Sequence, residues 1–200
     1  GDGDNDGYSA QFADYDNDGD LDLHLANNAA EDKLFQNNDG VFTDVGEAQG
    51  VANTGNARGN AWADVDDDGD LDLYLSNFGG TNVLYTNDNP SSTVLYVKPV
   101  STSGYYTMFG ATVNLYLSSS DTFVATRLID GGSGYASQNA YAAQFASLST
   151  DTCYDIEIYA TDGTTVWYYC WSTSTSDSVN TLVMASTPGP TTSPGPSISP

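Results

Sequence analysis

The chain has 200 residues, of which 12% are aromatic, and a formal net charge of -23 at pH 7. This length and aromatic content indicate a folded protein of one or two domains rather than an acidic disordered tail. The charge argues strongly against nucleic acid or an anionic membrane surface as a partner. The sequence has no apolar run long enough to span a bilayer, so we expect no membrane insertion.

The chain opens on an acidic segment, Asp2-Gly3-Asp4-Asn5-Asp6-Gly7. Asp2, Asp4 and Asp6 have the spacing of the first carboxylates of a metal loop, but Ala10 stands where the last carboxylate would be. We interpret the segment as a partial third site, or as the tail of a repeat that starts upstream. Since Gly1 lies inside the motif, with no initiator Met or signal peptide, we expect a processed or truncated N-terminus.

Two acidic loops, fifty positions apart, have the residue pattern of a metal-binding turn. Residues 14–22 and 64–72 each place carboxylates at positions 1, 3, 5 and 9 and Gly at position 6. Gly permits the positive φ that turns such a loop inward, and the gathered carboxylates repel each other unless a cation lies among them. Hard oxygen ligands in a flexible loop favour Ca²⁺ over Mg²⁺, which keeps its waters and needs a stricter octahedron.

We therefore expect two full calcium sites and treat metal-free acidic turns as the alternative. The predicted ligands are the side chains of Asp14, Asp16, Asp18 and Asp22 with the Asp20 carbonyl, and of Asp64, Asp66, Asp68 and Asp72 with the Asp70 carbonyl. Asp67 is expected to point to solvent. An EF-hand is excluded, because Leu25 and Leu75 stand where it needs a Glu.

Each loop lies within a repeat that reads strand, calcium turn, strand, loop, strand. Alternation along the strand after each loop predicts a buried leucine face, formed by Leu21, Leu23 and Leu25 and by Leu71, Leu73 and Leu75. His24 alternates with the first set, so we expect it on the strand surface.

The sequence Ala-Asp-x-Asp-x-Asp-Gly-Asp-Leu-Asp-Leu, at residues 13–23 and 63–73, resembles the calcium loop of FG-GAP/VCBS repeats. The resemblance implies blades of an integrin-like β-propeller. Two blades cannot close a propeller. We expect residues 1–90 to be open, blade-like calcium-binding repeats packed on the next domain, the alternative being further blades upstream.

Residues 91–185 contain seven short β-rich runs separated by turn residues, which predicts a β-sandwich. The runs are Val94–Val100, Ala111–Leu117, Phe123–Ile129, Tyr141–Phe145, Tyr154–Tyr159, Val166–Trp171 and Val179–Met184. Asp162-Gly163 is a hairpin turn signal that brings Cys153 near Cys170. We predict a disulfide between them, with two free buried thiols as the alternative.

Phe109-Gly110-Ala111-Thr112-Val113, Arg127 and the segment 130–139 resemble the ASPIC/UnbV domain, which typically follows VCBS repeats in extracellular proteins. The chain departs from that family where Ala160-Thr161 replaces a Trp-Pro pair. The family has no established catalytic residues, so the resemblance implies a module and not a reaction. The Gly131–Asn139 loop either binds a ligand such as a sugar, through Tyr135, Gln138 and Asn139, or locks two strands together.

Residues 186–200 are rich in Pro, Ser and Thr, which predicts an extended, polyproline-II-like linker or stalk. In a secreted protein such a tract is an O-glycosylated stalk; a bare linker is the alternative. The candidate glycosylation positions are Thr187, Pro188, Pro190, Thr191, Thr192, Ser193, Pro194, Pro196 and Ser197.

These features together predict an all-β, extracellular protein. We do not expect an enzyme, because His24 is the single histidine and carboxylates held by calcium are poor acids. The favoured function is a secreted, calcium-stabilised structural or adhesive module of a filament, appendage or matrix, with self-association or other extracellular proteins as partners. The alternative is an extracellular module that recognises a glycan or a protein.

Overall fold

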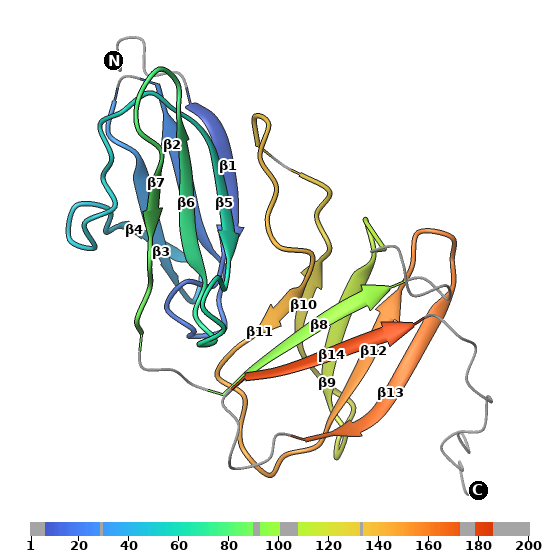
Figure 1. The fold of residues 1–200 in the computed structure, drawn as a ribbon. Helices are drawn as coiled ribbons and strands as arrows, with labels where there is room; N and C mark the ends of the chain where they lie inside the picture. Colours follow the sequence, from blue (N-terminus) through green and yellow to red (C-terminus); the bar gives the residue numbers. More distant parts are fainter. Residues whose placement is uncertain are drawn as a thin grey trace, which may run out of the picture.

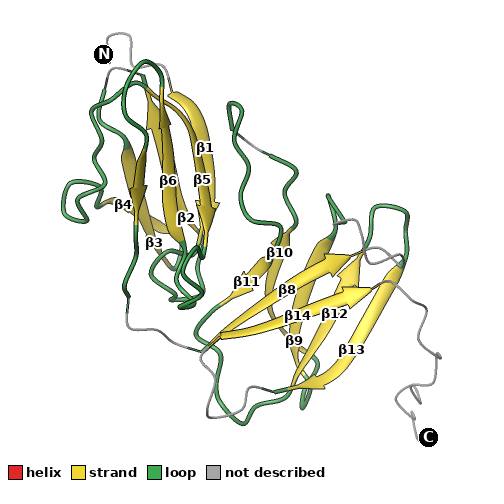
Figure 2. Cartoon of the chain, in the orientation of Figure 1, coloured by secondary structure: helices red, strands yellow, loops and turns green. Residues whose placement is uncertain are grey.

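The computed structural model describes residues 7–28, 30–89, 93–100, 108–132, 134–172 and 179–185. The described residues are all-β, with no helix and therefore no helix that could cross a membrane (Figure 2). The strands are β1 (Gly7–Ala13), β2 (Asp22–Asn27), β3 (Lys33–Asn38), β4 (Val41–Asp44), β5 (Ala57–Ala63), β6 (Asp72–Asn77), β7 (Val83–Tyr85), β8 (Val94–Val100), β9 (Thr112–Leu117), β10 (Thr122–Leu128), β11 (Ala143–Phe145), β12 (Tyr154–Tyr159), β13 (Thr165–Trp171) and β14 (Val179–Ala185).

The first seven strands form two matching sheets, ordered β1-β2-β3-β4 and β5-β6-β7. Ala13 pairs with Asp22 and, fifty positions on, Ala63 pairs with Asp72. Each first strand carries its irregularity at the same place, after Gly7 and after Ala57. The predicted internal repeat is thus confirmed in backbone register, and we call the two sheets the repeat pair.

The two sheets of the repeat pair pack face to face, since β5 contacts both β1 and β2. In the second repeat Leu71, Leu73 and Leu75 are buried, as predicted. In the first repeat the prediction is wrong, because Asp22, His24 and Ala26 are buried while Leu21, Leu23 and Leu25 are only half-buried.

The cause of this reversal is the close approach of β5 to β2. His24 is 0% exposed, its Nδ1 lies 2.7 Å from Asn60 Nδ2, and its ring meets Trp62 edge to face at 6.2 Å between centroids. A polar partner and a large ring across the sheets therefore fix which face of β2 is covered. The expected surface position of His24 is therefore wrong, and its burial lowers the pKa of the imidazole to about 4.

The remaining strands form a second sandwich, with sheets ordered β10-β9-β12-β13 and β11-β8-β14. Its core joins both sheets and includes Val97 and Phe145 on one side and Leu115 and Ile156 on the other. All seven strands begin and end within two residues of their predicted positions. The structure contains the disulfide between Cys153 and Cys170, and Gly163 has the positive φ of 88° expected at the hairpin turn.

The repeat pair rests on the second sandwich and shares a core with it (Figure 1). Val94, Tyr96 and Ala146 of the second sandwich belong to the same buried cluster as Trp62 and Leu73. The sheets stay open, with no closed barrel among the described residues. The predicted fold class, open blade-like repeats packed on a β-sandwich, is therefore confirmed.

Candidate metal centres at the junction of the two sandwiches

Each acidic loop is a tight turn that its own carboxylates hold closed. In the first loop the Gly19 N–H donates to Asp14 Oδ2 (3.1 Å) and the Asp20 N–H donates to Asp18 Oδ1 (2.9 Å). The matching bonds of the second loop are Gly69 N–H to Asp64 Oδ2 (3.0 Å) and Asp70 N–H to Asp68 Oδ1 (2.9 Å). Gly19 and Gly69 have φ of 103° and 102°, which explains the need for Gly at position 6.

The carboxylate at position 9 of each loop ties the turn to the end of the repeat's third strand. Asp22 accepts hydrogen bonds from the Tyr15 N–H (3.0 Å) and the Asn37 N–H (2.7 Å). Asp72 accepts the equivalent bonds from Val65 (2.8 Å) and Asn87 (2.9 Å). Each carboxylate oxygen keeps a second lone pair, so these bonds leave capacity for a metal.

The carboxylates form three groups, and within each group the oxygens lie close enough together to hold one metal ion. Oxygens of Asp14, Asp16 and Asp18 lie within 4.8 Å of one another, as do oxygens of Asp64, Asp66 and Asp72. A third group joins Asp66 and Asp68 to Asp88. The structure thus gathers most of the predicted side-chain ligands, and Asp67 is exposed and outside these groups, as expected.

The side chains of Asp20 and Asp70 do not belong to these groups. Asp20 Oδ2 accepts from the Asp39 N–H (2.8 Å), and Asp70 Oδ1 accepts from Asn17 Nδ2 of the other loop (2.6 Å). Their predicted ligand atoms are backbone carbonyls, so this arrangement is compatible with the prediction and does not test it. Asp2, Asp4 and Asp6 lie outside the described residues.

Sequence reasoning missed Asp88 as a candidate ligand. It follows β7 and lies outside the nine-residue loop pattern, sixteen positions beyond Asp72. The alignment of the two repeats could have identified it, because Asn87-Asp88 occupies the place of Asn37-Asn38 in the first copy. A carboxylate at that place in one copy only gives the second loop one more anionic ligand candidate than the first.

The donor set of the first loop fits a hard cation. Neither Asp14 Oδ1 nor Asp16 Oδ1 has a hydrogen-bond partner among the described residues, although both atoms are buried. Burial raises the pKa of Asp14 to about 7, with Asp18 and Asp16 adding to the effect and Arg127 opposing it. Burial also raises the pKa of Asp22 to about 7. Buried anionic oxygens without partners are costly, and an all-oxygen set of this kind is what Ca²⁺ prefers.

The guanidinium group of Arg127, on β10 of the second sandwich, reaches the first loop. Arg127, whose side chain is 11% exposed, donates from Nη2 to the Gly19 carbonyl (2.8 Å) and lies 3.6 Å from Asp14 Oδ2. Its Nε donates to the Gln144 carbonyl (3.0 Å). Burial lowers the pKa of Arg127, while the charge of Asp14 opposes that shift. The side chain therefore connects the second sandwich to both the backbone and a carboxylate of the loop.

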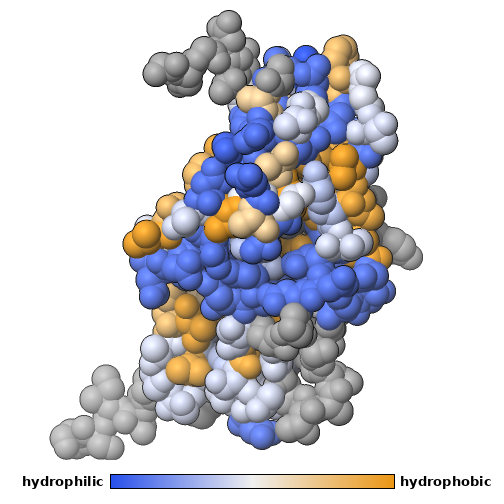
Figure 3. All heavy atoms as spheres, turned by 90° about the vertical axis from the view of Figure 1, so that its left-hand side faces the viewer, coloured by the Kyte–Doolittle hydropathy of each residue, from blue (hydrophilic) through white to orange (hydrophobic). Residues whose placement is uncertain are grey.

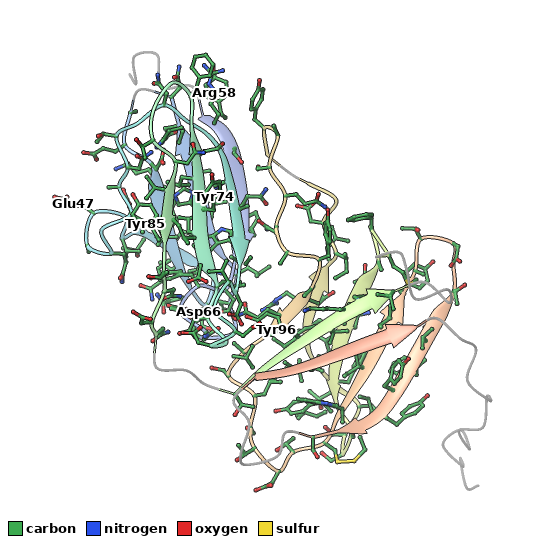
Figure 4. All side chains as sticks on the ribbon, viewed as in Figure 1. Glu47, Arg58, Asp66, Tyr74, Tyr85 and Tyr96 are labelled. Atoms are coloured by element: carbon green, nitrogen blue, oxygen red, sulfur yellow. A yellow bond between two sulfur atoms is a disulfide. The ribbon has the colours of Figure 1, made fainter. Side chains whose placement is uncertain are left out.

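Neutral side chains of the second sandwich hold the two loops as well. The Tyr96 hydroxyl donates to the Gly69 carbonyl (3.1 Å), and Gln144 Nε2 donates to Asn17 Oδ1 (3.0 Å). The Ser147 hydroxyl donates to the Asn17 carbonyl (2.8 Å). Asp66 and Tyr96 lie together at this junction in Figure 4, and Figure 3 shows a band of hydrophilic side chains across the molecule at the same height. The acidic loops therefore form the joint between the two sandwiches.

The Gly131–Asn139 loop packs along the repeat pair. The Trp62 N–H donates to Asn139 Oδ1 (3.0 Å), and the Ala140 N–H donates to the Trp62 carbonyl (2.9 Å). The ring of Tyr135 meets that of Tyr8 edge to face at 5.8 Å. Of the predicted ligand residues, Asn139 is thus engaged within the chain and Tyr135 stays exposed, while Gln138 accepts from the Tyr141 hydroxyl (2.6 Å). These contacts favour the interpretation of a locking loop.

Gly134→Ala is expected to displace this loop from β1. A Cβ at Gly134 would lie 1.8 Å from Ser9 Oγ and 2.5 Å from Ser137 Oγ, so the loop or β1 must move. The matched control is Gly131→Ala, whose Cβ would meet Phe109 at an ordinary 3.7 Å. We expect lower thermal stability and faster amide exchange at Trp62 and Ala140 in Gly134→Ala only. Equal exchange in the two variants would refute the locking role.

Asp88→Asn is expected to weaken calcium binding at the second loop, because it removes one charge from the group that contains Asp66 and Asp68. Loss of one of several oxygen charges should weaken binding by roughly tenfold, about 1.4 kcal/mol. Asp67→Asn is the matched control, because Asp67 is exposed and its φ of 61° suits Asn as well. Calcium titration of both variants measures the effect. Equal affinities would exclude Asp88 as a ligand.

Comparison with known protein families finds a match that contains both acidic loops. Residues 14–75 match the FG-GAP-like repeat. FG-GAP repeats often bind calcium, and the matched segment contains both acidic loops. No curated protein matches the chain. Among solved structures, the chain is similar to BcpA, the major pilin subunit of Bacillus cereus, with 13% identity and a TM-score of 0.30.

The structural similarity covers 57% of this chain and 36% of the length of the pilin subunit. The FG-GAP match ends at Leu75, within β6. The resemblance of residues 109–139 to ASPIC/UnbV domains lies beyond it and stays a prediction. The FG-GAP segment therefore covers both acidic loops and the strands from β2 to β5 of the repeat pair, and the contacts with Arg127, Tyr96 and Gln144 come from outside it.

Proposed function

We propose that this chain is an extracellular structural or adhesive module whose two FG-GAP-like loops each bind Ca²⁺. The observation that carries the proposal is the position of the loops at the junction of the two sandwiches. There the buried Oδ1 atoms of Asp14 and Asp16 have no hydrogen-bond partner among the described residues, and Arg127 and Tyr96 hold the loop backbones. Calcium in the loops would stabilise each loop and stiffen the joint. The proposal assigns no catalytic reaction to the chain.

An extracellular setting is supported by the disulfide between Cys153 and Cys170, because reducing compartments do not preserve such bonds. Calcium loops suit millimolar external calcium as well. The Pro-rich segment 186–200 lies outside the described residues. We propose it as a spacer or stalk that carries O-linked sugars at its Ser, Thr or Pro residues.

Self-association into a filament or matrix is supported by the open sheets. β4 (Val41–Asp44) is an edge strand whose four residues are all exposed, including Val41 and Phe42. An edge strand presents unpaired backbone groups that a strand of another copy can cover. We therefore propose that copies of this chain assemble through strand edges into an extended structure.

Negative-stain electron microscopy of the full chain, at increasing concentration in calcium and in EDTA, tests this function. We expect extended assemblies in calcium that disperse on chelation. Dispersed monomers at every concentration in both buffers would refute the proposed assembly, while leaving calcium binding to be decided by titration.

A further inference from the structure

The outer face of the sheet β10-β9-β12-β13 carries a row of aromatic rings. Phe123 on β10 lies opposite Tyr116 on β9, with centroids 5.8 Å apart. Tyr116 in turn lies 5.5 Å from Trp167 on β13, and Trp167 lies 5.9 Å from Tyr169. We call these four residues the aromatic row. It reaches from one edge strand of the sheet to the other, as the strand order in Figure 1 shows.

The aromatic row faces solvent. Phe123 is 54% exposed, Tyr169 is 60% exposed and Trp167 is 39% exposed. The packing of the second sandwich uses the opposite face of the sheet, where Val113, Leu115 and Ile156 are buried. The row is therefore not part of the core. A contiguous exposed apolar patch on a folded protein commonly marks an interaction site.

Hydrogen-bonding side chains fill the centre of the same face. Glu157 pairs with Asn114 on one side and Trp167 on the other. Its Oε2 accepts from Asn114 Nδ2 (2.8 Å) and from the Tyr116 hydroxyl (3.1 Å), while the Thr126 hydroxyl donates to Asn114 Oδ1 (2.7 Å). The rings thus lie beside a small polar network that can accept and donate further bonds.

The charges of this face indicate an uncharged partner. Besides Arg127, which turns toward the first acidic loop, the four strands carry only Asp155 and Glu157 as charged residues. Asp155 accepts from the Ser118 hydroxyl and the Cys170 N–H, so neutral donors hold both carboxylates. A polyanion would find no cation here and would meet a net charge of -23.

We propose that the aromatic row binds an extended, neutral polysaccharide. A sugar ring has an apolar C–H face that packs on an aromatic ring and a rim of hydroxyls that bond to groups such as Glu157 and Asn114. Three strand spacings give the row a length of about 14 Å, more than one sugar ring, so the surface fits a chain of several sugars. This inference deepens the proposed adhesive role by naming a partner class, and it does not depend on filament formation.

Affinity electrophoresis in native gels containing calcium tests the proposal, with hydroxyethylcellulose, galactomannan and laminarin as neutral probes and alginate as the anionic comparison. We expect retardation by at least one neutral probe and none by alginate. Trp167→Ala and Tyr169→Ala should each weaken retardation roughly tenfold, the ratio expected from losing one buried aromatic contact. Tyr74→Ala is the control, because Tyr74 is an exposed tyrosine on β6 of the repeat pair, away from this face.

Three results would overturn the proposal. The first is no retardation by any neutral probe. The second is equal retardation of the wild type, Trp167→Ala and Tyr169→Ala. Tyr169→Ala is included because its ring is the most exposed of the row, so its removal should leave the fold intact. The third is concentration-dependent self-association, or binding of a synthetic 186–200 peptide, that depends on Trp167 without any polysaccharide binding. That result would assign the face to a protein contact. Absence of filaments in electron microscopy would leave the proposal intact.

Discussion

Removing calcium with EDTA is expected to lower the melting temperature of the chain by roughly 6–12 °C. A site at ten times its dissociation constant contributes about 1.4 kcal/mol, so two sites contribute about 3 kcal/mol. For a chain of this size each kcal/mol shifts the melting temperature by about 2–4 °C. Differential scanning calorimetry in calcium, in EDTA and in EDTA with excess magnesium measures the shift.

The loss of stability on chelation should reach beyond the repeat pair. Val94 and Tyr96 of the second sandwich share a core with Trp62 and Leu73, and Arg127 and Gln144 hold the first loop directly. Hydrogen exchange should therefore accelerate at β8 as well as at β1 and β5. Identical melting curves in calcium and in EDTA would contradict the role assigned to the loops.

Arg127→Met is expected to destabilise the chain by about 3–5 kcal/mol in EDTA, the usual cost of removing one partner of a buried ion pair. The substitution leaves the Asp14 carboxylate, which is 1% exposed, without its cationic neighbour. Calcium in the loop would supply that positive charge. The loss should therefore be smaller in calcium, and calcium should bind the variant more tightly than it binds the wild type.

Urea unfolding of the wild type and of Arg127→Met, each with and without calcium, forms a double cycle. The cycle measures the coupling free energy between Arg127 and bound calcium. Arg58→Met is the matched control, because Arg58 lies over the rings of Tyr8 (4.3 Å) and Phe78 (4.6 Å), far from Asp66 in Figure 4. Its effect should be the same in both buffers. An Arg127→Met loss that calcium does not change would show that Arg127 and the metal site are independent.

Local patterns were sufficient to predict most strands of this fold, but not β4 (Val41–Asp44). Alternation and turn residues placed the seven strands of the second sandwich, and Asp162-Gly163 placed Cys153 beside Cys170. The spacing of the acidic loops predicted their turns, because a nine-residue segment with Gly at position 6 has few ways to bring its carboxylates together.

The contacts between segments far apart in the chain could not be predicted from the sequence. Gln144 meets Asn17 across 127 positions, and Arg127 meets the Gly19 carbonyl across 108 positions. The burial of His24 has the same origin, since it depends on Asn60 and Trp62 in the other sheet. Alternation shows that a strand has two different faces, and the packing of the neighbouring sheet then decides which face is covered.

Isothermal titration of calcium into the EDTA-treated and dialysed chain tests the central claim most directly. We expect two calcium ions per chain, one lost in Asp14→Asn and the other in Asp64→Asn, with Asp67→Asn unchanged. Binding of no calcium at millimolar concentrations, or binding that neither loop variant reduces, would contradict it.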